Sequence, residues 1–381
     1  MRLQKYILVV AVLFSTLLPT IALAQDDGTT PDVITIEKAT VLQMTDQHWT
    51  TIPGTDTPSE IQTLKARVLD GADKGQVVTF DNNFTQLNVG DTFYIRHDRT
   101  NDGIDYWTVS DAYRLNVLIG LGLVFLLLIF VFGGIQGIRG LASLAGSLIL
   151  IFYVLLPGIL HGYSPIFISI GVSSLIIIAG SYITHGFNKT TSAAVIGMLL
   201  TVIVTGLGAY YVIHIGHFSG YSSEESVYLN FDTHGNISMI ALLFGGIMIG
   251  LLGVLYDIAI GQAIAVEELF RAGTHMNRLQ IYRRAIRIGR EHIGALVNTL
   301  AIAYVGVALP LLLLFKETYS SANASVGSII NGELFSTEIV RMLVGGIGLI
   351  LAVPITTLIA TYMLSKVKES SSPSGHSHSH H

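Results

Sequence analysis

Residues 251–269 read LLGVLYDIAIGQAIAVEEL, and residues 289–314 read GREHIGALVNTLAIAYVGVALPLLLL. They belong to two apolar runs, from Ile237 to Ala265 and from Ile293 to Phe315, each longer than the roughly 20 residues that a bilayer helix needs. A basic segment, from Arg271 to Arg290, connects the two runs. This arrangement predicts two membrane-spanning helices that are joined by a charged hairpin.

The first run contains an acid, Asp257, and the second contains Asn298 and Thr299. A carboxylate inside a membrane span costs a few kcal/mol on insertion scales, so such a residue normally faces the bundle interior and has a function. Glu267 and Glu268 follow Asp257 by about three turns, which places Asp257 about one to two turns inside the hydrocarbon. The alternative is that Asp257 lies close enough to the membrane edge to reach water.

The composition is that of a membrane protein, because 51% of the 381 residues are hydrophobic, only 12% are charged, and the mean hydropathy is +0.60. The chain has no cysteine, which excludes disulfides, thiolate metal sites and cysteine nucleophiles. Residues 25–112 hold fifteen Asp and Glu against six Lys and Arg, so the rest of the chain is net positive. No strongly basic soluble module is present, so nucleic acid is not an expected partner.

Residues 1–24 combine two basic residues, an apolar run and a final Ala-Leu-Ala pattern. These features predict a secretory signal peptide that is cleaved after Ala24. The apolar run is also long enough for an uncleaved anchor helix. A polar linker, 25–32, follows, and in either case the next residues are delivered to the far side of the membrane.

The candidate soluble domain is 33–112, where short β-branched runs alternate with turn signals such as Asp70-Gly71. Five short strands are typical of a small closed β-barrel, and we predict an extracytoplasmic, OB-like domain. The aromatic residues Phe93, Tyr94, Tyr106 and Trp107 are predicted to belong to its core. The predicted strands are Val33–Thr40, Leu64–Leu69, Gln76–Phe80, Thr92–Arg96 and Tyr106–Val109.

The region 113–364 is predicted to be a polytopic α-helical membrane domain of about seven transmembrane helices. With the β domain outside, the loops on the opposite side contain ten Lys and Arg, whereas the loops on the β side contain only Lys316. The positive-inside rule therefore agrees with the signal peptide and predicts a cytoplasmic C-terminus. The predicted spans are 114–133, 141–160, 165–184, 190–213, 237–264, 293–315 and 339–364.

The basic cytoplasmic hairpin, 266–292, has apolar residues close to helical spacing with arginines between them. This pattern predicts an interfacial amphipathic helix that faces anionic lipids. An ordinary cytoplasmic helix with a solvated charged face is the alternative. The arginines that would contact lipid are Arg278, Arg283, Arg284, Arg287 and Arg290.

Depth along the predicted spans places several polar residues in one layer near the cytoplasmic side. Pro354 is predicted to break the last span and to free a backbone carbonyl beside this layer. Equal depth does not establish contact, because the sequence does not give the order of the helices in the bundle. The predicted intramembrane polar site consists of Asp257, Asn298, Thr299, Thr356 and Thr357.

No motif indicates an enzyme, because the G-x-S-x-G, H-E-x-x-H and P-loop patterns do not occur, and no catalytic residue is assigned. No cofactor is expected beyond a divalent metal, for which the outer-loop residues His214, His217 and His234 are candidates. The tail 365–381 is rich in Ser and His and is predicted to be disordered. Its histidines fit either a native metal binder or a purification tag.

Several stretches carry a resemblance to a known family. The two stretches quoted first belong to this set, together with GGIQGIRGLASL (133–144), FYVLLPGILHGYSP (152–165) and EIVRMLVGGIGLILAVPITTLIA (338–360). In this order they resemble the YibE/F-like family of bacterial multi-span membrane proteins, and YWTVSDAYR (106–114) resembles the end of the family's extracytoplasmic part. The resemblance implies a protein of the bacterial cytoplasmic membrane. A looser similarity of pattern links the chain to the transmembrane halves of resistance-nodulation-division and SecD/SecF proteins.

These observations favour an ion- or proton-coupled transporter in which Asp257 alternates between protonation states. The alternative is a non-transporting membrane scaffold or sensor that acts through its extracytoplasmic β domain. The expected partners are the lipid bilayer, anionic lipids at the cytoplasmic face, and a small solute or ion that the sequence does not name. Whether the protein forms a homo-oligomer stays open at this stage.

Overall fold

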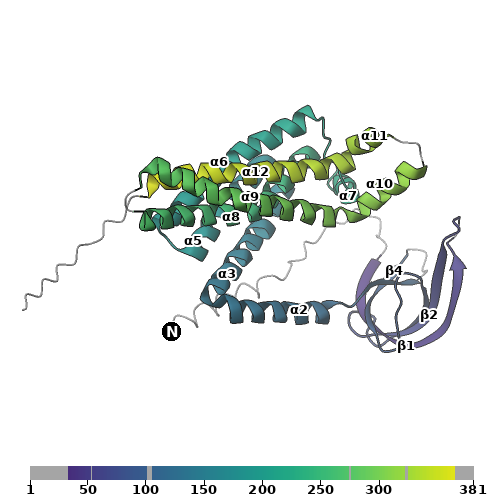
Figure 1. The fold of residues 1–381 in the computed structure, drawn as a ribbon. Helices are drawn as coiled ribbons and strands as arrows, with labels where there is room; N and C mark the ends of the chain where they lie inside the picture. Colours follow the sequence, from purple (N-terminus) through teal and green to yellow (C-terminus); the bar gives the residue numbers. More distant parts are fainter. Residues whose placement is uncertain (1–32, 53, 101–104, 274–275, 322–324, 365–381) are drawn as a thin grey trace, which may run out of the picture. The chain divides into compact units, whose positions relative to one another are not determined.

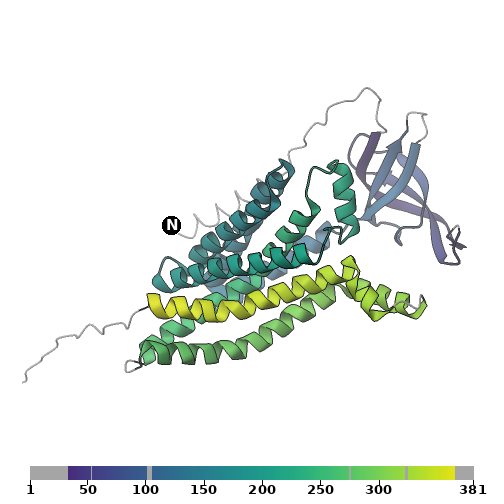
Figure 2. The same ribbon diagram turned by 90° about the horizontal axis from the view of Figure 1, so that it is seen from above.

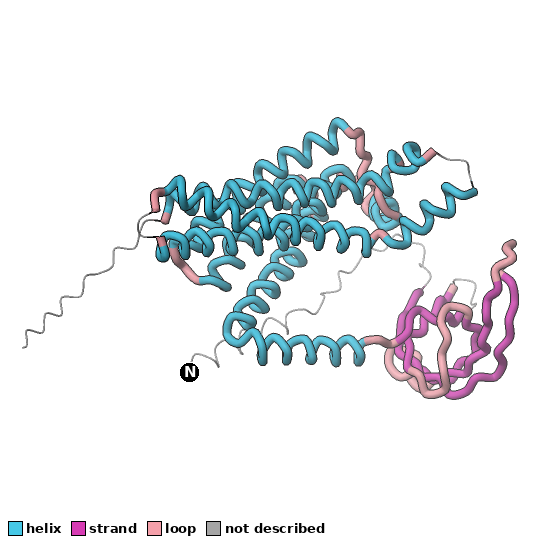
Figure 3. The backbone as a smooth tube through the Cα atoms, viewed as in Figure 1, coloured by secondary structure: helices cyan, strands magenta, loops and turns pink. Residues whose placement is uncertain are grey.

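The computed structural model describes residues 33–52, 54–100, 105–273, 276–321 and 325–364. The predicted signal peptide, the polar linker and the His-rich tail lie outside the described residues and stay predictions. The chain divides into two compact units between Phe132 and Gly133, and each unit is described by itself. The described strands all lie in the first unit, and the second unit is helical (Figure 3).

The first unit contains a five-stranded antiparallel sheet, whose strands are β1 (Val33–Thr51), β2 (Pro58–Val68), β3 (Val77–Asn82), β4 (Thr92–Arg99) and β5 (Asp105–Ala112). The hydrogen-bonded order is β3-β2-β1-β4-β5, and the sheet curls into a half-barrel (Figure 1). Side chains alternate between the inside and the outside, and Leu64, Phe93 and Ile95 are fully buried within it. The five predicted strands are confirmed, whereas the hydrogen-bonded sheet is open where a closed barrel would pair β3 with β5.

The β1–β2 hairpin is much longer than predicted and extends beyond the sheet. The two strands pair with each other as far as Thr51 and Pro58, whereas β1 pairs with β4 only over 33–40 and β2 pairs with β3 only over 62–67. The end of the hairpin is therefore a two-stranded ribbon. The alternation of apolar and polar residues stops after Val41, so the sequence pattern gave no signal for this ribbon.

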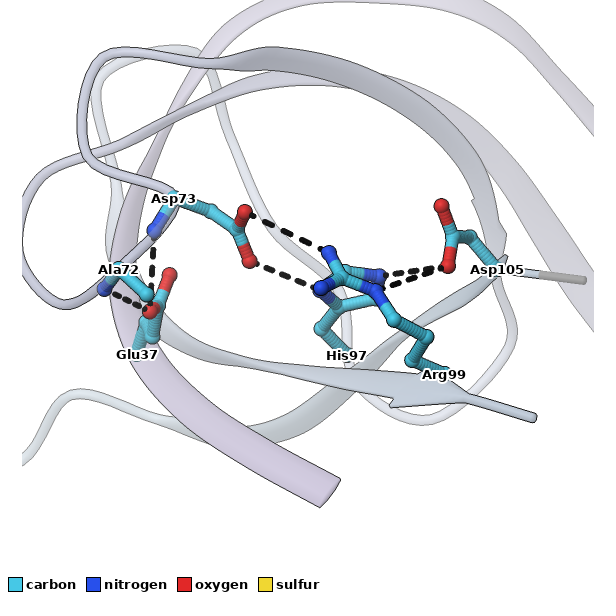
Figure 4. A network of polar contacts seen from close by, with 6 residues as sticks. All are labelled: Glu37, Ala72, Asp73, His97, Arg99 and Asp105. Atoms are coloured by element: carbon cyan, nitrogen blue, oxygen red, sulfur yellow. Dashed lines mark hydrogen bonds and ion pairs between the residues drawn. The ribbon is translucent and has the colours of Figure 1, made fainter. Parts of the chain in front are cut away.

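A polar network holds the turn between β2 and β3 against the sheet (Figure 4). Glu37 is buried, and its Oε1 accepts hydrogen bonds from two backbone N–H groups of the turn, at 2.6 and 3.3 Å. His97 lies between two carboxylates, with Nδ1 2.8 Å from Asp73 Oδ2 and Nε2 3.3 Å from Asp105 Oδ1. The network therefore joins β1, β4 and β5 to the turn.

The aromatic residues of this unit divide into core and surface. Phe93 is fully buried, and Trp107 packs against the core with its ring stacked on His97 at a centroid distance of 3.7 Å. The prediction was wrong for Tyr106, which is 53% exposed because it precedes Trp107 on β5 and points to the opposite face.

Gly71→Ala is expected to destabilise the first unit more than Gly75→Ala. Both glycines have positive φ, at 78° and 90°, so each substitution carries a backbone strain of about 1–2 kcal/mol. A Cβ at Gly71 would also lie 2.0 Å from Glu37 Oε1 and would displace this carboxylate, whereas a Cβ at Gly75 meets nothing within 4 Å. Loss of the Glu37 hydrogen bonds adds about 1.5–3 kcal/mol.

Tryptophan fluorescence during urea unfolding measures this difference, because both tryptophans of the chain, Trp49 and Trp107, lie in the first unit. Equal midpoints for the two variants would contradict a structural role for the Glu37 contact.

The first unit ends within η1 (Ile129–Gly133), which follows α2 (Leu115–Leu128), and neither element has a buried residue. In the second unit α12 packs against α6, α8 and α9, and α8 also packs against α5 (Figures 1 and 2). The second unit consists of α3 (Gly134–Leu150), η2 (Ile151–Leu155), α4 (Leu156–Leu160), α5 (Pro165–His185), α6 (Lys189–Ile215), α7 (Glu224–Asp232), α8 (Met239–Ala272), α9 (Arg278–Val307), α10 (Leu309–Ser321), α11 (Val326–Asn331) and α12 (Glu333–Met363).

By length and hydropathy, five described helices can cross a membrane, or six if α9 and the start of α10 form one span with a 63° bend. The sequence predicted about seven spans, and the difference from five or six arises where two predicted spans form one helix and where another is bent. The predicted spans 114–133 and 141–160 fall in one continuous helix, Leu115–Leu160. The predicted span 293–315 contains the bend between α9 and α10.

Candidate functional site

Asp257 lies near the middle of α8, about 27 Å from the first residue of the helix and about 22 Å from the last. One side of α8 is buried against neighbouring helices, and Asp257 lies on the exposed side. A Cβ at Gly246, Gly253 or Gly261 of the same side would meet nothing within 4 Å. Open space therefore accompanies Asp257 along this side of the helix.

Asp257 has no hydrogen-bond or ion-pair partner among the described residues. Its neighbour Tyr256 donates a hydrogen bond to the carbonyl of Gly180, at 3.1 Å, and so connects α8 to α5. The predicted partners Asn298 and Thr299 are exposed on α9, and the Thr299 hydroxyl donates to a carbonyl of its own helix, at 3.0 Å. The structure thus does not pair Asp257 with Asn298 or Thr299.

A buried polar contact between helices lies at Gln262, which is 3% exposed on α8. Its Nε2 donates to the carbonyl of Ala285 on α9 and to Oγ1 of Thr357 on α12, both at 2.8 Å. A buried hydrogen bond between membrane helices stabilises their packing. Sequence reasoning missed Gln262, although an amide inside an apolar run is a signal of the same kind as Asp257.

The predicted helix break at Pro354 is not found, because α12 continues through this residue from Glu333 to Met363. Proline has no N–H, so the carbonyl of Ile350 loses its usual helical partner. The hydroxyls of Thr357 and Thr361 donate to carbonyls four residues earlier, at 2.6 and 2.7 Å. These side-chain bonds supplement the backbone bonds of the helix beside the proline.

Thr356 is also fully buried, and its Oγ1 faces Gly197 of α6. It belongs to a set of hydroxyls that are buried within the second unit and have no hydrogen-bond partner in the described structure. The set consists of Ser169, Ser173, Ser181, Thr205, Thr337 and Thr356.

The described part of the basic hairpin consists mainly of the end of α8 and the start of α9, and Asn277 and Gln280 form a capping box at the start of α9. The predicted interfacial helix is the first part of α9, where Leu279 is 56% exposed and Tyr282 and Ile286 are half-buried. Ile281 and Ala285 are fully buried within the bundle. The five arginines are exposed on the remaining surface of α9 and comprise Arg278, Arg283, Arg284, Arg287 and Arg290.

The loop after α6 is tied to the start of α12 through Glu333. Its Oε1 accepts hydrogen bonds from the backbone N–H groups of Ser219 and Gly220, at 2.8 and 2.7 Å. Its Oε2 accepts from the Ser219 hydroxyl, at 2.6 Å. On α7, hydrogen bonds from its own backbone and from Ser223 lower the pKa of Glu225.

The predicted metal ligands are not gathered by the structure. His214 lies in the last turn of α6 and stacks on Tyr210 at a centroid distance of 6.0 Å, while His217 and His234 occupy turns with φ of 52° and 51°. Within the described ranges, no three His, Asp or Glu side chains are grouped so that they could hold a metal ion. The metal site stays a prediction without a formed cluster.

Long apolar helices preceded by a β sheet define a multi-pass helical membrane protein with an N-terminal β domain. A family model described as YibE/F-like protein matches residues 121–366. The chain therefore belongs to the YibE/F-like family, as its sequence motifs predicted. Neither a curated protein nor a solved structure matches the chain.

Proposed function

We propose that this protein is an ion- or proton-coupled transporter and that Asp257 is its coupling group. This proposal rests on the position of Asp257 near the middle of the 34-residue apolar helix α8. Asp257 has no hydrogen-bond or ion-pair partner there among the described residues. A carboxylate in such a place requires a proton, a cation or water. A protonated acid costs far less free energy in an apolar medium than a carboxylate does. Binding or release of a proton or cation at Asp257 therefore changes the free energy of keeping this side chain within the membrane.

The surroundings of Asp257 support this role. The open positions beside Gly253 and Gly261 leave room for water or an ion next to the carboxylate. On the buried side of α8, Gln262 holds the helix to α9 and α12. The acid thus lies on a helix that is fixed on one side and open on the other, which fits a group that exchanges its cation.

A hydrophobic carbodiimide tests this proposal without knowledge of the substrate, because it modifies protonated carboxyl groups in apolar surroundings. We expect modification of Asp257, detected by mass spectrometry of the full chain, and we expect protons or a competing cation such as Na⁺ to change its rate. Glu268, which is exposed at the helix end, is the internal control. Modification of neither residue in any condition, or of both to the same extent, would count against a coupling role.

The proposed membrane arrangement has seven spans, an OB-like β domain outside the bacterial cytoplasmic membrane and a cytoplasmic C-terminus. The helix Leu115–Leu160 would measure roughly 69 Å if it were straight, more than twice the roughly 30 Å of the hydrocarbon core. Gly134 inside it has a φ of 53°, in the left-handed region. We therefore assign its two halves to separate crossings.

Single cysteines test this topology directly, because the natural chain has none. Glu224→Cys at the start of α7 is expected to react with a membrane-impermeant maleimide added to intact cells. Leu279→Cys at the start of α9 is expected to react only after the membrane is opened. Both side chains are exposed, so accessibility within the protein does not limit either reaction. Labelling of Leu279→Cys in intact cells would refute the arrangement.

Anionic lipids at the cytoplasmic face are the proposed partners of the α9 arginines. Arg283, Arg284, Arg287 and Arg290 are exposed and have no ion-pair partner among the described residues. Each basic residue near an anionic surface contributes about 1 kcal/mol. Replacing all four by Gln is expected to lower the ratio of phosphatidylglycerol to phosphatidylcholine that copurifies with the protein. Lys65→Gln in the β domain is the control, and an unchanged ratio in the fourfold variant would contradict the assignment.

A scaffold or sensor that acts through the β domain is the second candidate, because the ribbon of the β1–β2 hairpin extends beyond the sheet. Deleting 33–108 distinguishes the candidates. Loss of the cellular phenotype on deletion, with no effect of Asp257→Asn, would favour the scaffold. The opposite order of severity would favour transport through the spans.

A further inference from the structure

A groove of about 190 Å³ lies where the β1–β2 hairpin leaves the sheet. Trp49 of β1 lines it, and Phe84, in the segment after β3, also lines it. These two side chains are 67% and 64% exposed. Aromatic side chains that line a concave site beside a few polar groups are typical of ligand-binding pockets.

The segment that carries Phe84 is held in place by two buried amides. Gln62 Oε1 accepts a hydrogen bond from the Leu87 N–H at 3.0 Å, and Asn82 Oδ1 accepts from the Phe84 N–H at 3.1 Å. The two amides also bond to each other, with Asn82 Nδ2 donating to Gln62 Oε1 at 3.0 Å. Gln62 and Asn82 are 3% and 2% exposed, so the wall of the groove is fixed before any ligand arrives.

The polar side chains that line the groove include one carboxylate, Glu60, and several amides. Glu60 lies opposite Trp49 in the β1–β2 ladder, so the two side chains project from the same face. Glu60 Oε2 accepts a hydrogen bond from Gln86 Nε2, and Glu60 Oε1 accepts one from Gln47 Nε2, both at 2.5 Å. The described residues that line the groove include no lysine or arginine.

We propose that this groove binds one ring of an uncharged saccharide. The C–H face of a sugar ring packs on exposed aromatic rings, and its hydroxyl groups both donate and accept hydrogen bonds, which suits a carboxylate beside amides. A lining with one negative charge and no positive charge disfavours phosphates, nucleic acids and acidic sugars. The volume is below the roughly 300–1,000 Å³ of a pocket for a drug-sized ligand, so it suits a single ring of a longer chain or of a lipid headgroup.

A peptide fits these observations less well. Extended peptides usually bind by adding a strand to a sheet edge, through backbone hydrogen bonds. The groove is instead built from side chains on the face of the hairpin and from the segment after β3. This inference does not depend on Asp257, so a failure of the transporter proposal leaves it unchanged, and the reverse also holds.

Calorimetry on the full-length protein in lipid nanodiscs, prepared without sugar-based detergents, tests the proposal. The probes are chitohexaose, maltohexaose and cellohexaose, and vesicles that contain a galactolipid. At least one saccharide is expected to bind and to shift the fluorescence of Trp49. In the Trp49→Ala variant, Trp107 is the only tryptophan left, so this variant gives the fluorescence of Trp107 by itself. Binding to soluble chains alone identifies a polysaccharide as the source, and binding to galactolipid vesicles alone identifies a lipid headgroup.

Gln86→Ala and Trp49→Ala are each expected to weaken saccharide binding by about tenfold or more. Tyr106→Ala removes an exposed aromatic ring from β5, outside the groove, and is expected to leave binding unchanged. Absence of saccharide binding to the wild type would overturn the proposal. Equal binding by Trp49→Ala and the wild type would also overturn it, as would capture of an extended alanine-rich peptide in place of every saccharide.

Discussion

Asp257→Asn is expected to reduce coupled transport strongly while the protein folds as the wild type does. The amide has nearly the same shape as the protonated acid but cannot release a proton or bind a cation by charge. Because Asp257 has no partner among the described residues, the substitution breaks no described contact. We expect a loss on the order of 100-fold, which corresponds to a barrier increase of about 2.7 kcal/mol.

The measurement is ion or proton flux into proteoliposomes between about pH 5 and 8, together with melting of the same samples. Asp257→Glu keeps the charge and is expected to retain part of the flux, whereas Asn298→Ala is the control on the neighbouring helix. For stability, Asp257→Leu is expected to perturb the bundle less than Asp257→Lys, because a new cation in the span is costly. Full flux in Asp257→Asn with an unchanged pH profile would show that the acid is structural or water-facing.

Gly197→Leu is expected to cause a large loss of stability in the helical unit. A Cβ at this position of α6 would lie 2.4 Å from Thr356 Oγ1 and 3.0 Å from Thr356 Cα. The second of these atoms belongs to the backbone, so a rotamer change of Thr356 cannot relieve the overlap. The helices α6 and α12 must separate, and overpacking of this kind costs about 1–3 kcal/mol or more.

Gly246→Leu is the matched control, because a Cβ at Gly246 of α8 meets nothing within 4 Å. It is expected to change the free energy of unfolding by no more than about 0.5 kcal/mol. Thermal unfolding of both variants in the same lipid, followed by the far-ultraviolet helix signal, compares them. Similar melting temperatures would mean that α6 and α12 do not approach as closely as the structure has them.

Helix and strand content was predictable where hydrophobic periodicity is strong. Runs such as Ile237 to Ala265 are too long and too apolar for a soluble helix, and the motifs around them identified the family. Strand ends were less predictable. The polar ribbon beyond Val41 has no apolar alternation, so only its pairing with β2 reveals it as a strand. Turn signals gave the positions of the other strands because glycine and Asp favour specific backbone angles.

The candidate site shows the same division. The sequence by itself determined that an acid lies inside an apolar helix, since residue type and local hydropathy are enough for that inference. It also determined the basic hairpin between two long helices. Which residues meet was decided only by tertiary packing, because the side that a membrane helix presents to its neighbours depends on helix order and rotation. That packing buries Thr356 and Thr357, leaves Asp257, Asn298 and Thr299 exposed, and gives the interhelical hydrogen bonds to Gln262.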